Sequence, residues 1–222
     1  METLYVLPIL LFSVVVHEVA HGMMALRLGD PTARDMGRLT LNPVPHIDLI
    51  GSIAIPLLSI LAAGQVFIAW AKPVPVNPLY FEDRRRGDIL VSVAGPLSNL
   101  VMALVCALGY VVAIRLFGRT DAADGFSALV RGFIIHMLSA GVTLNVFLAV
   151  FNLIPVPPLD GSHVLASLLP DTAAAAYRQI GFFGILVVIM LMRVPFVRDI
   201  LYGIVGLIQA PYILLIHPLL QV

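Results

Sequence analysis

Charged side chains are scarce in this sequence. Asp, Glu, Lys and Arg together make up 12% of its 222 residues, whereas an average soluble domain carries about 25%. Hydrophobic residues reach 60%, and the mean hydropathy is +1.01. The composition excludes an ordinary soluble enzyme and indicates a chain that lies within a lipid bilayer.

The sequence also contains only one cysteine and carries no formal net charge. The single cysteine, Cys106, cannot form an internal disulfide, and its apolar neighbours indicate a packing role. The formal net charge is +0, so no basic surface points to nucleic acid as a partner. The N-terminus has no basic stretch ahead of its apolar run, which is typical of a retained membrane span rather than a cleaved signal peptide.

Apolar stretches recur along the chain at lengths that suit a bilayer. A helix needs about 20 apolar residues to cross the hydrocarbon core, and the runs in this sequence end at Gly, Pro and polar residues that stop helices. We expect spans at residues 4–28, 88–117, 126–153, 173–192 and 197–216. These runs predict a multi-pass protein of the cell membrane.

One further apolar stretch, residues 47–71, is interrupted. Pro56 and the sequence Ala-Ala-Gly-Gln at 62–65 divide it into halves of roughly ten residues, and alternating prolines make residues 70–77 extended. The stretch is either an ordinary span or an element that dips in and returns on the same side. The predicted fold is an all-α polytopic membrane protein of five to six transmembrane helices, with a re-entrant or extended element at 47–77.

The most informative motif lies inside the first expected span. His17-Glu18-Val19-Ala20-His21 interrupts a run that is otherwise almost wholly apolar. Residues four apart lie on one face of a helix, so both imidazoles can point at one place, while Glu18 lies about 100° around the axis. A catalytic zinc site needs this pair of nitrogen ligands and a carboxylate beside the metal-bound water. The alternative is a polar trio that hydrogen-bonds inside a bundle, but ionisable groups within a span favour function.

Asp160 is the best candidate for a third ligand, because a catalytic zinc usually has three protein ligands and one open position. It follows the three prolines at 155–158, which unwind the preceding helix. Irregular backbone at membrane depth is tolerated only where it is buried in protein or lines a water-filled cavity. Gly161 gives the turn its freedom. Asp160 could also cap a short helix at 163–169, which does not exclude ligation. The remaining histidines are expected in the core, in a loop or at the interface: His46, His136, His163 and His217.

Three asparagines lie within the expected spans. Asn152 lies eight residues before Asp160, where the helix is expected to break. Its amide could donate to a developing oxyanion or hold a substrate backbone; it could equally satisfy carbonyls that the prolines leave free. Asn99 and Asn145 are expected to form hydrogen bonds between helices.

Basic residues cluster on both flanks of the 47–71 stretch. The positive-inside rule places both flanks in the cytoplasm, which fits re-entry and places the histidine motif and Asp160 towards the cytoplasmic side. Arg115, Arg119 and Arg131 count against this orientation, because it leaves them outside. The flanking basic residues are Arg27, Arg34, Arg38, Lys72, Arg84, Arg85 and Arg86.

Several motifs together resemble the site-2 protease family of intramembrane zinc metalloproteases. They are HEVAH at 17–21, AGPLSN at 94–99 and FNLIPVPPLDG at 151–161, joined by GRLTLNPVPHIDLIGS at 37–52 and WAKPVPVNP at 70–78, which resemble the compact prokaryotic members. The likeness covers roughly residues 10–165. It implies that His17, His21 and Asp160 bind one zinc ion per chain, that Glu18 is the catalytic base, and that Asn152 assists at the active site.

The resemblance also implies a role in regulated intramembrane proteolysis, by hydrolysis of peptide bonds within or near the transmembrane segments of substrate proteins. We expect a single membrane-embedded metalloprotease domain at 1–222, without a PDZ or CBS domain, with a catalytic core at about 4–165 and two additional spans at about 173–216. One alternative is a membrane metal or ion transporter that uses the same His, Glu and Asp cluster. Another is an inactive family relative that acts as a scaffold.

Overall fold

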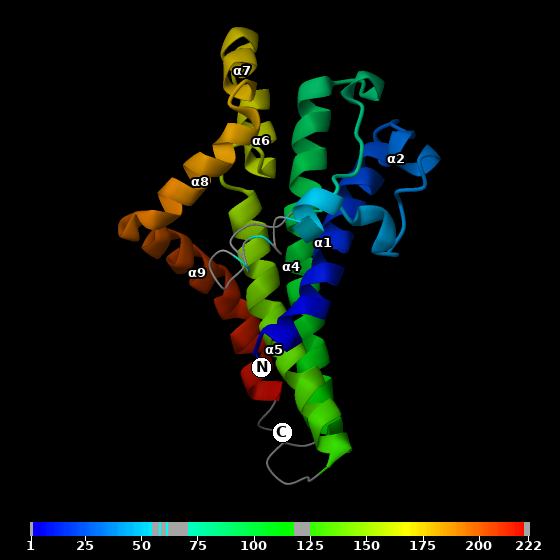
Figure 1. Cartoon of the computed structure of the whole chain (residues 1–222), viewed down its shortest axis with the longest axis vertical. Coiled ribbons are helices and arrows are strands. Elements are labelled where there is room, and N and C mark those ends of the chain that lie inside the picture. Colours follow the sequence, from blue (N-terminus) through cyan, green and yellow to red (C-terminus); the bar gives the residue numbers. More distant parts are fainter. Residues whose placement is uncertain (1, 55–57, 59–60, 62–70, 118–124, 220–222) are drawn as a thin grey trace.

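Helices make up the regular structure of the described part of the chain. The computed structural model describes residues 2–54, 58, 61, 71–117 and 125–219, and within these ranges every regular element is a helix, with no sheet (Figure 1). The predicted all-α class is confirmed.

Four helices are long and apolar enough to cross a membrane: α1 (Glu2–Arg27), α4 (Arg84–Phe117), α5 (Phe126–Asn152) and α9 (Pro195–Leu219). They contain 25 to 34 residues, which gives lengths of about 38 to 51 Å at 1.5 Å per residue. Each therefore exceeds the hydrocarbon core of about 30 Å. The spans expected at 4–28, 88–117, 126–153 and 197–216 correspond to these helices, and the chain is a multi-pass membrane protein.

The chain between α5 and α9 is broken into shorter helices. They are α6 (Asp160–Leu168), α7 (Asp171–Arg178), η5 (Gly181–Phe183) and α8 (Gly184–Arg193). The expected span at 173–192 is therefore not one helix. It is divided at 179–183, where Gly181 has φ +47, a conformation that glycine adopts at little cost.

The α8 helix is too short to cross the bilayer as a single element. Its 10 residues give a length of about 15 Å, half of the hydrocarbon thickness. It meets α9 in a V whose apex points away from α5 (Figure 1). The hydropathy averaged over 173–192 is typical of a membrane span, but the apolar helix α8 begins only at Gly184.

The segment between α1 and α4 has little regular structure. It contains the short elements α2 (Thr32–Asp35), η1 (Val44–His46), η2 (Leu49–Ala54) and η3 (Pro78–Tyr80), and residues 71–77 are irregular, as the alternating prolines predict. Most of the predicted re-entrant stretch, residues 55–57, 59–60 and 62–70, lies outside the described residues.

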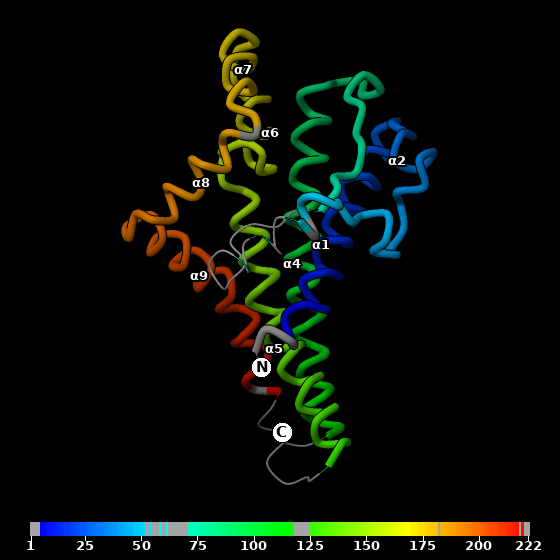
Figure 2. Tube along the Cα trace, viewed as in Figure 1, coloured from blue at the N-terminus to red at the C-terminus, as the bar shows by residue number. Residues whose placement is uncertain are grey.

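The α1 and α4 helices run antiparallel. Ala25, near the end of α1, packs with Phe81, just before α4, and with Val91 in the first turns of α4. Ile9 of α1 packs with Cys106, further along α4. Figure 2 shows the end of α1 and the start of α4 at the same end of the molecule. The chain that joins them therefore leaves and returns at the same end.

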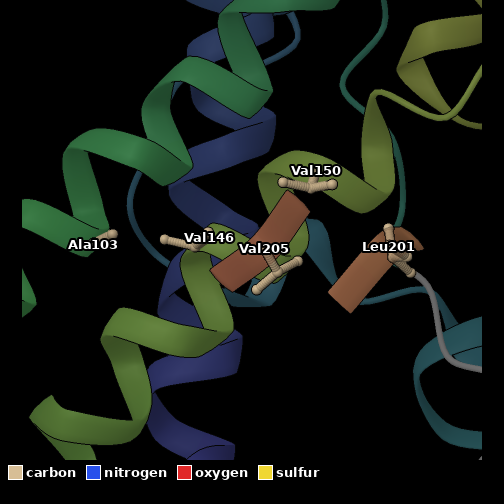
Figure 3. Packing of buried hydrophobic residues seen from close by; sticks show 5 residues of the cluster. All are labelled: Ala103, Val146, Val150, Leu201 and Val205. Atoms are coloured by element: carbon tan, nitrogen blue, oxygen red, sulfur yellow. The ribbon is translucent and has the colours of Figure 1, made fainter. Parts of the chain in front are cut away.

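A second packing layer joins α4, α5 and α9. Figure 3 shows Ala103 of α4 facing the α5–α9 contact, where the buried side chains of two α5 residues meet those of two α9 residues. Helices in lipid associate through close van der Waals packing rather than through a hydrophobic force between them, so small residues at these crossings matter. The cluster consists of Ala103, Val146, Val150, Leu201 and Val205.

Gly141 lies at a tight contact between α1, α4 and α5. A Cβ at this position would lie 2.7 Å from Cys106 Sγ and 3.0 Å from Ile9 Cγ1, and both neighbours are buried. Because neither side chain can move into solvent, the absence of a side chain at 141 sets how closely the three helices approach.

We expect Gly141→Ala to destabilise the protein, because overpacking a tight core costs about 1–3 kcal/mol. Gly109→Ala is the matched control: its Cβ would lie 3.3 Å from the flexible end of Leu138 at the same α4–α5 contact. Apparent melting temperatures in detergent would compare the two variants. The double variant Cys106→Ala/Gly141→Ala should recover part of the loss, and equal melting temperatures for the two single variants would contradict this account.

Candidate metal centre

The two histidines of the motif lie one above the other on α1. His17 and His21 are both buried, and their Nε2 atoms are 3.0 Å apart. The rings meet nearly at right angles, with an interplanar angle of 84°. The helical spacing therefore brings two imidazole nitrogens to one point, as the motif predicts.

Asp160 completes the cluster from a different part of the chain. Its Oδ2 lies 3.1 Å from His17 Nε2 and its Oδ1 lies 3.4 Å from His21 Nε2. It is the first residue of α6, reached through the proline-containing break after α5. One ligand atom from each of the three residues lies within 4.8 Å of the others.

The structure shows Asp160 turned towards the histidines rather than capping α6. The N-cap residue is Leu159, and no side-chain hydrogen bond caps the helix. Asp160 Oδ2 is buried and has no hydrogen-bond partner among the described residues. A buried carboxylate oxygen without a donor is costly unless a cation meets it.

Glycines allow the backbone to come close on two sides of the cluster. A Cβ at Gly95 of α4 would lie 2.5 Å from His21 Cε1 and 2.6 Å from His17 Cε1. A Cβ at Gly161 would lie 2.7 Å from the carbonyl oxygen of Ile154. Side chains at these positions would displace the rings or the turn that carries Asp160. The sequence indicated close packing for 94–99, but it did not show that Gly95 faces the histidine rings.

The far nitrogen of each imidazole is hydrogen-bonded to an oxygen. His21 Nδ1 lies 2.7 Å from the carbonyl oxygen of Val91, and His17 Nδ1 lies 2.6 Å from Asn99 Oδ1. A carbonyl oxygen only accepts, so His21 Nδ1 carries a proton, and in the neutral ring its Nε2 presents a lone pair towards Asp160.

A chain of amides determines the same protonation for His17. Asn145 Nδ2 donates to the carbonyl oxygen of Gly141 (2.9 Å), and Asn99 Nδ2 donates to Asn145 Oδ1 (3.0 Å). Because the Gly141 oxygen can only accept, each amide has its orientation fixed in turn. Asn99 must present its oxygen to His17, which therefore donates from Nδ1. Both asparagines are fully buried.

The donor set fits a zinc ion. With both rings neutral, two unprotonated nitrogens and a carboxylate face one another, an arrangement that repels unless a cation lies between them. Ligands at zinc bond lengths in tetrahedral geometry lie about 3.3 Å apart, and the separations between the three residues are 3.0, 3.1 and 3.4 Å. Hydrogen bonds to the far nitrogens are the usual support of metal-binding histidines.

Glu18 is bound to a different part of the chain. Its Oε2 accepts a hydrogen bond of 2.8 Å from the backbone N–H of Val74. The side chain is half-buried. No side-chain pattern indicates this contact, because the donor is a backbone amide 56 residues away.

Asn152 is the last residue of α5. Its Nδ2 donates to the carbonyl oxygen of Leu148 at 2.9 Å, one turn back in the same helix. Leu148 O is not among the carbonyls that the prolines at 155, 157 and 158 leave free, which are those of residues 151, 153 and 154, so both roles offered for Asn152 stay predictions. Asn99 and Asn145 form hydrogen bonds between helices, as expected, but their partners, each other and His17, were not predicted.

The other four histidines lie outside the cluster. His46 is buried, and its Nε2 is 3.0 Å from the carbonyl oxygen of Thr40. The ring of His136 lies 5.3 Å from that of Tyr5, between centroids. His163 and His217 are exposed. Among the described residues, only His17, His21 and Asp160 form a group of three potential metal ligands.

Comparisons with known proteins agree with this geometry. The model of the family described as "Peptidase family M50" matches residues 115–192. The chain is 37% identical to "Putative zinc metalloprotease YwhC" of Bacillus subtilis over 191 residues, which cover 86% of this chain and 81% of that protein. No solved structure was found to match.

Two mycobacterial relatives carry the same kind of name. "Putative zinc metalloprotease Rip2" of Mycolicibacterium smegmatis is 32% identical over 83% of this chain and 65% of its own length. The Rip2 protein of Mycobacterium tuberculosis H37Rv is 31% identical over 88% of this chain and 69% of its own length. The chain therefore belongs to peptidase family M50, the intramembrane zinc metalloproteases of the site-2 protease type.

Proposed function

We propose that the chain hydrolyses peptide bonds in membrane-spanning segments of other proteins, with one zinc ion held by His17, His21 and Asp160. The observation that carries the proposal is the hydrogen bond that each imidazole Nδ1 makes to an oxygen behind its ring. The neutral rings therefore turn their Nε2 lone pairs towards the Asp160 carboxylate. A zinc ion bound there would supply a water of lowered pKa and a Lewis acid for the substrate carbonyl.

Glu18 acts as general base in this proposal. It follows His17 directly on α1, so its carboxyl is attached one residue from a proposed ligand. Its Oε2 is occupied by the Val74 N–H, which leaves Oε1 to take the proton of the attacking water. The same carboxyl then passes the proton to the amine of the leaving peptide.

Asn152 assists in the same reaction. It lies at the end of α5, immediately before the break that leads to Asp160. Its Nδ2 is bound to the Leu148 carbonyl oxygen, so its Oδ1 can accept from a backbone N–H of an unwound substrate. This role holds the substrate near the ligands and involves no proton transfer.

The active site lies nearer the cytoplasmic side in this proposal. The end of α1 and the start of α4 lie together (Figure 1), and basic residues gather there, which the positive-inside rule associates with the cytoplasm. The described ends of the joining segment lie at this same end, which supports re-entry of residues 47–71, most of which lie outside the described residues. The basic residues of the described ranges near this end are Arg27, Arg34, Arg38, Lys72, Arg84, Arg85 and Arg86.

The whole chain is proposed to form one membrane-embedded protease domain. The ligands come from α1 and α6 within the core at about 4–165, and α9 of the C-terminal part packs on α4 and α5 through the Ala103 cluster. That shared packing supports one domain. The four long helices account for four of the five to six transmembrane helices expected from the sequence.

Asp160→Ala should lose most of the bound zinc, because it removes one of three ligands. The matched control is Asp171→Ala at the exposed start of α7, where the carboxylate pairs with Arg85 instead. Elemental analysis of the purified proteins should find about one zinc per chain in the wild type and the control. Full zinc retention in Asp160→Ala would reject its role as a ligand.

Glu18→Gln should keep the zinc and lose cleavage, because a neutral amide cannot take the proton from water. Removal of a general base costs about 10²–10⁴-fold in rate. The measurement is cleavage of labelled single-span peptides in vesicles alongside zinc content. Cleavage at the wild-type rate in this variant would remove Glu18 from the mechanism, and loss of zinc would make it a ligand.

The orientation can be tested with single introduced cysteines. Glu82→Cys lies at the end near the start of α4, and Ser127→Cys lies at the opposite end, at the start of α5; both positions are exposed. Native Cys106 is buried and gives the background. We expect an impermeant thiol reagent to reach Glu82→Cys only from the cytoplasmic face and Ser127→Cys only from outside. The reverse pattern would contradict the proposed side.

A further inference from the structure

The irregular segment 71–77 lies directly against the histidine helix. Val74 donates its N–H to Glu18 Oε2 at 2.8 Å, and its buried side chain fills the space beside Gly22, where a Cβ would lie 2.8 Å from Val74 Cγ1. Glu18 and Gly22 are four residues apart and share one face of α1. Val74 therefore contacts this face through its amide and its side chain at once.

The beginning of the segment is held by the loop that follows α2. Lys72 N–H donates to the carbonyl oxygen of His46 at 2.9 Å. The Arg38 guanidinium donates through Nη2 to the carbonyl oxygens of Lys72 at 2.8 Å and Pro73 at 3.3 Å. Arg38 is only 6% exposed, so this anchor is an interior contact rather than a mobile surface one.

The end of the segment is held by Asp30, which is fully buried. Asp30 Oδ2 accepts from the Asn77 N–H at 2.7 Å, and Oδ1 accepts from the N–H of Thr32 at 3.0 Å. Burial alone would raise the pKa of Asp30, but the donors of Asn77 and Thr32 outweigh it and hold the pKa below its ordinary value. The carboxylate therefore stays charged at neutral pH and continues to accept the hydrogen bond from the Asn77 N–H.

The proline pattern leaves few amide protons in this segment. Pro73 and Pro75 have no N–H, so residues 72–77 carry only four amides, at Lys72, Val74, Val76 and Asn77. The first and last of these bind the anchors. The Val76 N–H has no hydrogen bond within the described part of the chain, and the Val74 N–H meets Glu18.

We propose that the Val74 N–H is a positioning donor for Glu18, an inference that rests on the proposed role of Glu18 as general base. A glutamate side chain has three rotatable bonds, and a carboxylate–amide bond is stronger than one between neutral groups. Binding Oε2 fixes the plane of the carboxylate and directs Oε1 to one place. The anchors at Arg38 and Asp30 determine where that donor lies, so the loop sets the geometry of the base.

The contact itself can be tested without substrate, by amide-resolved hydrogen exchange of the full-length zinc-loaded protein in nanodiscs. Glu18→Gln keeps an acceptor oxygen and should keep Val74 protected, whereas Glu18→Ala should expose it. The Lys72 and Asn77 amides should stay protected in both variants and serve as internal controls. A Val74 amide that exchanges as fast in the wild type as in Glu18→Ala would overturn the proposal.

The consequence for catalysis can be tested with Val74→Pro, which removes the N–H next to residues that are already proline. Val76→Pro is the matched control, because it removes an amide that makes no hydrogen bond to any described residue. With a fluorophore–quencher single-span peptide in phosphatidylcholine–phosphatidylglycerol vesicles, Val74→Pro should lower kcat about 10-fold, less than loss of a general base. KM and zinc content should stay at the wild-type values. Val74→Ala, which keeps the N–H, should recover most of kcat.

Two outcomes would overturn the positioning role: equal kcat for Val74→Pro and Val76→Pro, or an equally large loss in Val74→Ala, which would assign the effect to packing. A failure of the proposed function would look different. In that case neither the wild type nor Glu18→Gln would cleave the peptide, while hydrogen exchange would still decide whether Val74 holds Glu18.

Discussion

Each imidazole ring of the cluster is held from behind by an oxygen that accepts its Nδ1 proton. The acceptor is Val91 O for His21 and Asn99 Oδ1 for His17. The site depends on these two hydrogen bonds, because the opposite tautomers would point N–H groups at each other. Both acceptors belong to α4. The register of α4 against α1 is therefore also the condition for metal binding, and Gly95 permits it by leaving room for the rings.

Much of this arrangement could be predicted from side-chain pattern alone. The apolar runs located the four long helices, and the spacing of His17 and His21 with the proline break before Asp160 indicated that these three would meet. These signals are strong because ionisable groups are costly in lipid and a histidine pair four apart shares a helix face. The structure brings the three side chains together.

The remaining features could not be read from the sequence, for identifiable physical reasons. The donor to Glu18 is a backbone amide, and the acceptor for His21 is a backbone carbonyl, so neither has a residue-type signature. The contact between His17 and Asn99 joins residues 82 positions apart and depends on helix register. The division of 173–192 rests on one glycine conformation at 181, which averaged hydropathy does not detect.

The amide chain from Asn99 through Asn145 to the carbonyl of Gly141 ties α1, α4 and α5 together without any net charge. Dissolved ions screen contacts between charges at a surface, and a voltage across the bilayer acts on charges within it. Neutral, fully buried amides carry no net charge on which dissolved ions or the membrane voltage could act. The alignment of His17 should accordingly be the same in dilute and concentrated salt, and in an energised or a depolarised membrane.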